Sequence, residues 1–380
     1  MTGERIIRFI RNSKPGSPRD MIRQFTPNWF AATMGTGILA LALPQIPGAG
    51  PALNPIGEAL WLFNICLFTF FAALYASRWI LFWHEAKRIF GHSVVSMFIG
   101  TIPMGLATII NGFLAFGLAR WGNGVIAVAQ ALWWADAVMS LGCGVLIPYF
   151  MFTRHQHALD KMTAVWLLPV VAAEVTAASG GLLAPHLAGA QAQFLTLIAS
   201  YALWAYSVPV AFCILTILIL RMVLHKLPHE SMAASSWLAL GPIGTGSLGM
   251  LVLGGDAPVI FSAQGMANVG TVTAGLGVIL GTLLWGFGLW WLMLATLITI
   301  RYFRAGVPFN LGWWGYTFPL GVYTLATLKL GSLLGLGFFS MFGTVLVTAL
   351  AGIWLFVAAR TIHGGWKGHL FVSPCIAKAN

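Results

Sequence analysis

Long runs of hydrophobic residues alternate along the chain with short polar connections. A helix that spans a bilayer needs about 20 mainly apolar residues, and ten runs reach or approach that length. They lie at about residues 28–43, 55–83, 96–118, 124–153, 163–184, 191–224, 237–254, 266–303, 311–330 and 336–360. The runs lack the two-residue alternation of strands, and an open sheet would leave unpaired backbone groups in lipid. The pattern therefore predicts an all-α integral membrane protein with ten transmembrane helices.

The ten predicted helices are of two alternating kinds. The odd-numbered segments are short, rich in Gly, Ala, Ser and Thr, and each carries a proline: Pro27, Pro103, Pro169, Pro242 and Pro319. The even-numbered segments are longer and richer in Leu, Ile, Phe and Trp. Small residues let helices approach closely, and proline is tolerated in a membrane helix where neighbours, hydroxyls or water satisfy the freed carbonyls.

This alternation predicts five helix-pair repeats, with five kinked inner helices around a pore and five outer helices facing lipid. Because every odd segment would run in the same direction, the repeats would be parallel about an axis along the membrane normal. The competing interpretation is that Pro and Gly are simply more common in membrane helices than in soluble ones. That interpretation does not explain why the proline recurs at the same depth in every odd segment and in no even segment.

Basic residues predict the orientation. Lys and Arg collect in cytoplasmic loops of membrane proteins. If the N-terminus is cytoplasmic, all of the 20 Lys and Arg residues except Arg120 and Lys329 fall on the cytoplasmic side. We therefore expect both termini in the cytoplasm. The expected divisions are a basic cytoplasmic N-terminal segment (1–26), a ten-helix transporter domain (27–360) and a cytoplasmic tail (361–380).

Composition restricts the class of protein further. Hydrophobic residues make up 59% of the 380-residue chain and charged residues only 8%, against roughly 25% charged in soluble domains. The net charge of +11 is explained by topology, so we predict membrane lipid and no nucleic acid as a partner. The four cysteines have no CxxC spacing. No catalytic arrangement of residues is present, so we predict no enzyme activity, no cofactor and no metal site.

Small and hydroxyl-bearing residues on the odd segments are candidates for an anion path. The stretch Gly244–Gly249 matches the dinucleotide fingerprint GxGxxG, but it follows no predicted strand, so that interpretation fails. A narrow stretch of helix beside the path, with Thr245 and Ser247 offering hydroxyls, fits better. Thr36 and Gly37 on the first segment have a similar setting. The alternative for both is close helix packing.

The expected path also includes four of the prolines, Pro103, Pro169, Pro242 and Pro319. A separate candidate is one ionisable residue. Ionisable groups inside membrane helices are functional candidates by default. Glu174, midway along the fifth segment, is therefore a candidate proton or charge site, against the alternative of a protonated packing residue.

Phe318 directly precedes Pro319 on the ninth segment. A large ring on a kinked helix can close a narrow path, because hydrophobic constrictions gate by dewetting. The alternative for Phe318, from the sequence pattern alone, is ordinary packing.

Two stretches of sequence resemble a known family. The ninth segment, FNLGWWGYTFP (309–319) followed by LGVYTLAT, and the first segment, FTPNWFAATMGTG (25–37), resemble the tellurite-resistance/dicarboxylate transporter family. That family includes bacterial tellurite-resistance proteins, fungal malate permeases and sulfite efflux pumps, and plant slow anion channels. The resemblance covers essentially the whole chain.

The resemblance implies a homotrimer with a pore in each subunit, small anions as substrates, and a pore-blocking phenylalanine at Phe318. We therefore expect a multi-pass protein of the cell (inner) membrane that transports, and exports, a C4-dicarboxylate such as malate or sulfite. The alternative is a membrane sensor or scaffold protein that transports nothing.

Overall fold

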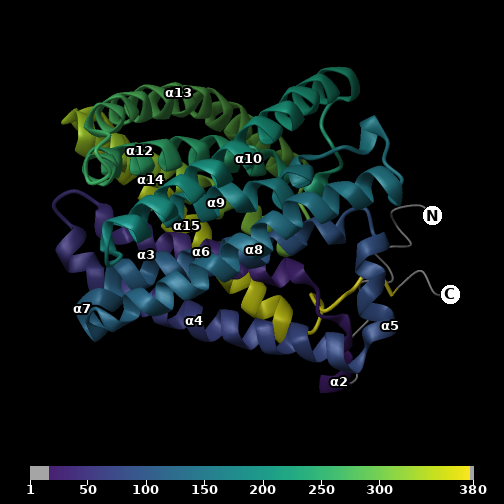
Figure 1. Cartoon of the computed structure of the whole chain (residues 1–380). Coiled ribbons are helices and arrows are strands. Elements are labelled where there is room, and N and C mark those ends of the chain that lie inside the picture. Colours follow the sequence, from purple (N-terminus) through teal and green to yellow (C-terminus); the bar gives the residue numbers. More distant parts are fainter. Residues whose placement is uncertain (1–16, 377–380) are drawn as a thin grey trace.

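The computed structural model describes residues 17–376, and within them the chain is helical, with no strand. The expected basic N-terminal segment and the expected tail therefore lie partly outside the described residues. Figure 1 shows the long helices running roughly side by side, with α13 and α4 on opposite sides of the bundle. The α-helices are α2 (Pro18–Gln24), α3 (Ala31–Ala42), α4 (Gly50–Leu81), α5 (Trp83–Ala86), α6 (Thr101–Gly112), α7 (Leu118–Trp121), α8 (Gly124–Thr153), α9 (Leu168–Leu183), α10 (Ala190–His225), α11 (Ser235–Leu238), α12 (Leu240–Ser262), α13 (Ala267–Ala305), α14 (Phe318–Leu334) and α15 (Gly337–Trp366).

Eight helical segments of the described chain are long and apolar enough to cross a membrane, which confirms an all-α membrane protein. They are Gly50–Leu81, Val95–Trp121, Gly124–Thr153, Ala164–His186, Ala190–His225, Glu230–Ser262, Ala267–Ala305 and Gly337–Trp366. The first and ninth predicted segments form the shorter helices α3, of 12 residues, and α14, of 17 residues. Each follows a short 3-10 turn, which extends it in the N-terminal direction.

Burial separates the helices into the two kinds that the sequence pattern predicts. All 12 residues of α3 are buried, as is nearly all of α9. By contrast, only a third or less of the most apolar window is buried in α4, α8, α10, α13 and α15. The exposed positions of these five helices carry large apolar side chains such as Phe152, Leu283 and Met341. Surfaces of this kind suit lipid or another apolar partner.

The buried helices pack in a closed ring in chain order. Helix α3 contacts α6, α6 contacts α9, α9 contacts α12, α12 contacts α14, and α14 contacts α3 again. We call these five the inner helices. Small residues allow the close approach: a Cβ built on Gly244 of α12 would lie 2.8 Å from the backbone nitrogen of Tyr323 on α14. Each inner helix also packs against an outer helix that is near it in sequence: α3 against α4, α6 against α8, α9 against α10, α12 against α13 and α14 against α15.

Four of the five recurring prolines lie where an inner α-helix begins. A 3-10 or short helical turn ends, and the α-helix starts one or two residues before Pro103, Pro169, Pro242 and Pro319. Proline is favoured there because the first helical N–H groups have no intrahelical acceptor. Pro27 differs, because it begins the 3-10 turn η1 (Pro27–Phe30) rather than α3.

Several neighbouring inner helices begin side by side. A Cβ on Gly241 would lie 3.9 Å from Cγ of Pro319, and one on Gly100 would lie 3.2 Å from Cα of Pro169. Thr101 donates a hydrogen bond to the carbonyl of Pro27 (3.0 Å). These contacts join the starting turns of α12 and α14, of α6 and α9, and of α3 and α6.

The two ends of the described chain meet beside the C-terminal end of α4. Arg78, which is 1% exposed, donates hydrogen bonds to the carbonyl of Phe25 and to Oγ of Ser373. The side-chain oxygen of Gln24 accepts a hydrogen bond from the backbone N–H of Ser373 (2.7 Å), and the ring of Phe371 stacks on Trp29. The last described residues therefore hold the start of the first inner helix in place.

Candidate functional site: a blind cavity inside the helix ring

A cavity of about 310 Å³ lies inside the ring, and all five inner helices contribute to its wall. Its lining residues recur at helical spacing, as in Val175, Ala178 and Leu182 of α9 and in Thr245, Leu248 and Val252 of α12. Near the C-terminal ends of the inner helices the described lining includes three exposed polar residues, Gln45, Asn54 and His186. The cavity therefore has a polar mouth at that end.

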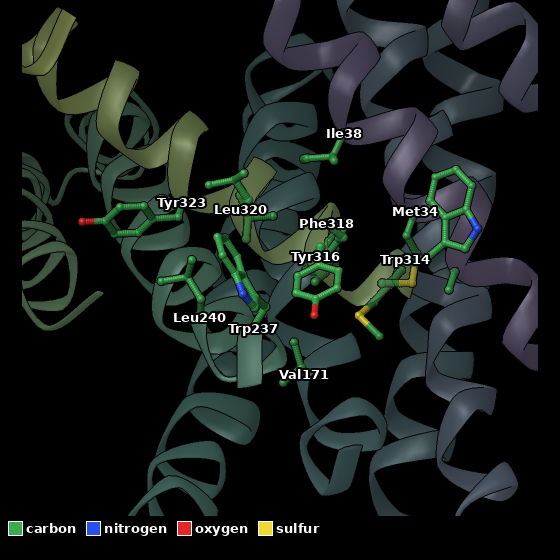
Figure 2. Close-up of a cluster of buried hydrophobic side chains, with 14 of the residues drawn as sticks. Met34, Ile38, Val171, Trp237, Leu240, Trp314, Tyr316, Phe318, Leu320 and Tyr323 are labelled. Atoms are coloured by element: carbon green, nitrogen blue, oxygen red, sulfur yellow. The ribbon is translucent and has the colours of Figure 1, made fainter. Parts of the chain in front are cut away.

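Phe318 lies at the opposite, closed end. It is the first residue of α14, whereas the lining of the other inner helices begins at least five residues further along each helix, for example at Ile38 and Val175. Its side chain is 2% exposed. In Figure 2 it lies in the middle of a cluster of buried hydrophobic side chains that includes Met34 and Val171. The cavity ends at this apolar cluster.

The polar side chains that line the cavity inside its mouth cannot ionise: they are those of Thr108, Asn111 and Thr245. No Lys, Arg, Asp or Glu is among the described lining residues. The hydroxyl of Thr108 already has protein partners, because it donates a hydrogen bond to the carbonyl of Gly105 (2.8 Å) and accepts one from the side-chain amide of Asn64 (3.2 Å). In contrast, Oγ1 of Thr245 and Oδ1 of Asn111 are buried and have no hydrogen-bond partner.

Of the residues predicted for the path, Thr245 and Phe318 border this cavity and the others have different surroundings. Thr36 turns to α15, where its hydroxyl accepts a hydrogen bond from the indole of Trp354 (3.0 Å). Ser247 donates to the carbonyl of Gly281 on α13 (2.7 Å). Gly37 packs against Thr108 so closely that a Cβ would overlap the threonine hydroxyl. Pro103, Pro169, Pro242 and Pro319 border the helix starts rather than the cavity.

Glu174 is fully buried on α9, and neither of its carboxyl oxygens has a hydrogen-bond partner. It does not line the cavity, although the next residue, Val175, does. A different carboxyl, Asp136 of α8, lies behind α9, where its Oδ2 accepts a hydrogen bond from Thr176 (2.7 Å). Among the described residues, no group of three or more His, Cys, Asp and Glu side chains could hold a metal ion.

Sequence reasoning did not single out Asn111 or His186. Asn111 stands just before a π-helical turn, Phe113–Gly117, and such turns within α-helices are frequent at functional sites. Leu114 and Ala115 of that turn also line the cavity. A polar asparagine within an apolar segment could have marked Asn111 as a candidate site residue. The sequence does not reveal the π-helical turn beside it.

The inner helices form a ring around a blind cavity, and outer helices with exposed apolar side chains surround this ring. This arrangement defines a membrane channel or transporter. The model of the voltage-dependent anion channel (SLAC1) family matches residues 24–362. The chain belongs to this family, as its first and ninth segments indicate, and it is an anion transporter rather than an enzyme.

Characterised and uncharacterised transporters are similar to the chain over most of its length. The sulfite efflux pump SSU1 of Arthroderma otae is 36% identical over 352 residues, which cover 92% of this chain and 93% of the pump. An uncharacterized transporter of Methanocaldococcus jannaschii is 29% identical, with 93% of this chain and 97% of the transporter covered. The malic acid transport protein of Schizosaccharomyces pombe is 22% identical, with 88% and 77% covered.

Proposed function

We propose that this protein exports small oxyanions, sulfite in particular, through a path that follows the cavity inside the helix ring. The observation that carries the proposal is the cavity itself, because all five inner helices line it and it ends at Phe318. Phe318 would be the gate: with its ring in place, water and ions meet an apolar barrier, and displacement of the ring would connect the cavity to the other side.

The lining, without Lys or Arg, supports an anion path with weak binding. Fast conduction requires a site that binds the ion well enough to admit it and weakly enough to release it. Hydroxyl and amide groups meet this condition better than a buried Lys or Arg would, and none of the described lining residues is a Lys or Arg. Sulfite is the first choice of substrate because the relative named a sulfite efflux pump is 36% identical, whereas the malic acid transport protein is 22% identical.

We propose ten transmembrane segments, with α3 and α14 as the first and ninth and with both termini in the cytoplasm. Support comes from the contact between the two described chain ends through Arg78 and Ser373, and from the basic residues that gather on that side. In this orientation the polar mouth faces outward and Phe318 lies toward the cytoplasm.

We also propose a homotrimer in the cell membrane, with one path in each subunit. The family resemblance supports the trimer, and the exposed apolar side chains of the outer helices give neighbouring subunits a surface on which to pack. The expected N-terminal, transporter and tail divisions are retained as part of this proposal.

Glu174 is the proposed proton or charge site beside the path. A Cβ on Gly181 of α9 would lie 2.8 Å from Cγ1 of Val252 on α12. Seven residues span about two helical turns, so residues seven apart lie on the same face of a helix. Glu174 is seven residues before Gly181, and Thr245 is seven residues before Val252. Glu174 and Thr245 are therefore expected to face each other two turns earlier along the two helices. The carboxyl is thus expected behind Thr245, on the far side of the cavity wall.

Anion flux from proteoliposomes tests the proposal. Purified protein in vesicles loaded with sulfite, malate, chloride or nitrate should release sulfite faster than malate. Vesicles without protein and vesicles containing a heat-denatured sample serve as controls. The absence of flux for all four anions would favour a sensor or scaffold and overturn the transport path.

A further inference from the structure

Thr245 is an exception among the threonines of the inner helices. The hydroxyls of all the other buried threonines on these helices have partners: Thr33, Thr36, Thr101, Thr108, Thr176, Thr324 and Thr327. Most of them donate to a carbonyl three or four residues earlier on the same helix. Thr245 makes no such bond, and its Oγ1 is buried without a partner. A buried hydroxyl left unpaired destabilises the fold, so its presence requires an explanation.

The position of Thr245 is as unusual as its missing hydrogen bond. Its side chain is 1% exposed and borders the cavity together with Phe318. It comes three residues after Pro242, whereas Phe318 comes one residue before Pro319, and the two helix starts touch at Gly241 and Pro319. With Gly241 level with Pro319, Thr245 lies beyond Phe318 by roughly 8 Å along the ring axis, at about 1.5 Å per residue.

The glycine before Thr245 explains how this residue comes to lie at the narrow end. A Cβ on Gly244 would lie 2.8 Å from the backbone nitrogen of Tyr323 on α14, whereas a Cβ on Gly246 would make only ordinary contact with Leu284 of α13 (3.4 Å) and Val208 of α10 (3.5 Å). A side chain at position 244 would therefore push α12 away from α14. Gly244 thus lets α12 approach α14 closely, and the next residue places its hydroxyl at the cavity.

An anion that passes a narrow apolar constriction loses much of its water shell, and groups on the protein must replace the lost hydrogen bonds. No Lys or Arg is among the described residues that line the cavity. The hydroxyl of Thr108 is already used, whereas that of Thr245 is free to donate.

We propose that the Thr245 hydroxyl is the hydrogen-bond donor that an oxyanion meets at the constriction, on the mouth side of Phe318. In the closed state the hydroxyl has no partner. When the Phe318 ring moves, the anion becomes that partner, so the hydrogen bond forms only during permeation. This inference rests on the proposed path and assigns one residue within it a role in substrate selection.

Three substitutions separate this role from ordinary packing. Thr245→Val keeps the shape but removes the donor, Thr245→Ser keeps the donor, and Thr324→Val removes a hydroxyl of α14 that donates to the carbonyl of Leu320 and does not line the cavity. Each is combined with wild-type Phe318 and with Phe318→Ala, and sulfite, chloride and nitrate fluxes are measured in proteoliposomes.

Thr245→Val should reduce sulfite flux about tenfold in both backgrounds, as expected for loss of one hydrogen bond to a charged group. Nitrate, which is more weakly hydrated, should lose less. Thr245→Ser and Thr324→Val should transport sulfite at close to the wild-type rate. Equal sulfite flux in Thr245→Val and wild type would overturn the assignment, as would an equal loss in Thr245→Ser.

A binding measurement keeps the inference separate from the proposed function. Sulfite should raise the thermal unfolding temperature of the detergent-solubilised Phe318→Ala protein, and Thr245→Val in that background should abolish the rise. An unchanged rise would reject the Thr245 site even if flux is absent. If the wild-type protein transports sulfite and Thr245→Val transports it at the same rate, the path is supported and the donor assignment is rejected.

Discussion

Gly37 of α3 and Thr108 of α6 are in such close contact that a Cβ on the glycine would overlap the threonine hydroxyl. Thr108 lines the cavity, and the same hydroxyl also bonds Asn64 and the carbonyl of Gly105. Gly37 was a candidate for the path, but it affects the cavity indirectly. Its lack of a side chain lets α3 approach α6 closely, and this contact fixes the position of Thr108 in the cavity wall.

Gly37→Ala should therefore lower the thermal unfolding temperature, because α3 and α6 would have to separate or Thr108 would have to leave its hydrogen bonds. The expected loss is about 1–3 kcal/mol, the usual cost of overpacking. Thermal unfolding in detergent measures it. Gly286→Ala on α13 is the matched control, since a Cβ there has no heavy atom within 4 Å; an equal effect of both substitutions would contradict the packing argument.

Phe318→Ala should raise anion flux, because the ring that closes the cavity is removed. An increase of about tenfold corresponds to a reduction of about 1.4 kcal/mol in the barrier. Flux from proteoliposomes or current in a planar bilayer measures the change. Phe152→Ala, on α8 at a side chain that is 83% exposed, is the control. Unchanged or reduced flux in Phe318→Ala would reject the gate.

Glu174→Gln should remove the pH dependence of anion flux if the carboxyl is the proton or charge site. An ionised carboxyl beside the path would repel the anion, so wild-type flux should fall as the pH rises, whereas the amide cannot ionise. Nitrate is the suitable anion, because its own charge does not change over the range. Glu58→Gln, in the ion pair with Arg120, is the control. A wild-type pH profile in Glu174→Gln would exclude the role.

Other titratable groups on the helices packed against α9 have separate surroundings. Asp136 accepts its hydrogen bond from Thr176, the hydroxyl of Tyr206 donates to the carbonyl of Leu141, and Cys213 of α10 is exposed. A pH profile that survives in Glu174→Gln but disappears in Asp136→Asn would transfer the role to Asp136.

The ion pair between Arg23 and Glu85 (2.5 Å) should make a small, pH-dependent contribution to stability. The hydrogen bond from Arg23 lowers the pKa of Glu85. A carboxyl whose pKa is lower in the folded state stabilises the fold above its unfolded pKa, about 4.3 for Glu, and loses that contribution as the pH falls through the folded pKa.

Glu85→Gln should thus lower the unfolding temperature slightly at neutral pH, by less than about 1 kcal/mol in free energy because the pair is partly exposed. The gap to wild type should close in strong acid, as thermal unfolding at a series of pH values would show. Glu230→Gln, at an exposed side chain in the short 3-10 turn η9 (Glu230–Met232), is the control. A gap that stays constant with pH would show that the effect is not electrostatic.

Much of the architecture could be predicted from local sequence. Apolar runs of sufficient length predict membrane helices because the bilayer admits few other structures, and small residues on alternate segments predicted which helices are buried. Thr245 was chosen for its setting among small residues, and Phe318 for its place before Pro319 and from the family resemblance; both border the cavity. Pro27 shows the limit, because a recurring residue need not occupy the same helical position in each segment.

The sequence by itself determined the class of protein, because apolar length, composition and the distribution of charge reflect the solvent around each segment. Only the tertiary structure decided which way each side chain points. Thr36, Thr245 and Ser247 have similar local settings, but they face α15, the cavity and α13 respectively. The rotation of each helix depends on packing with neighbours that are distant in sequence, and that packing left the Thr245 hydroxyl without a partner at the cavity.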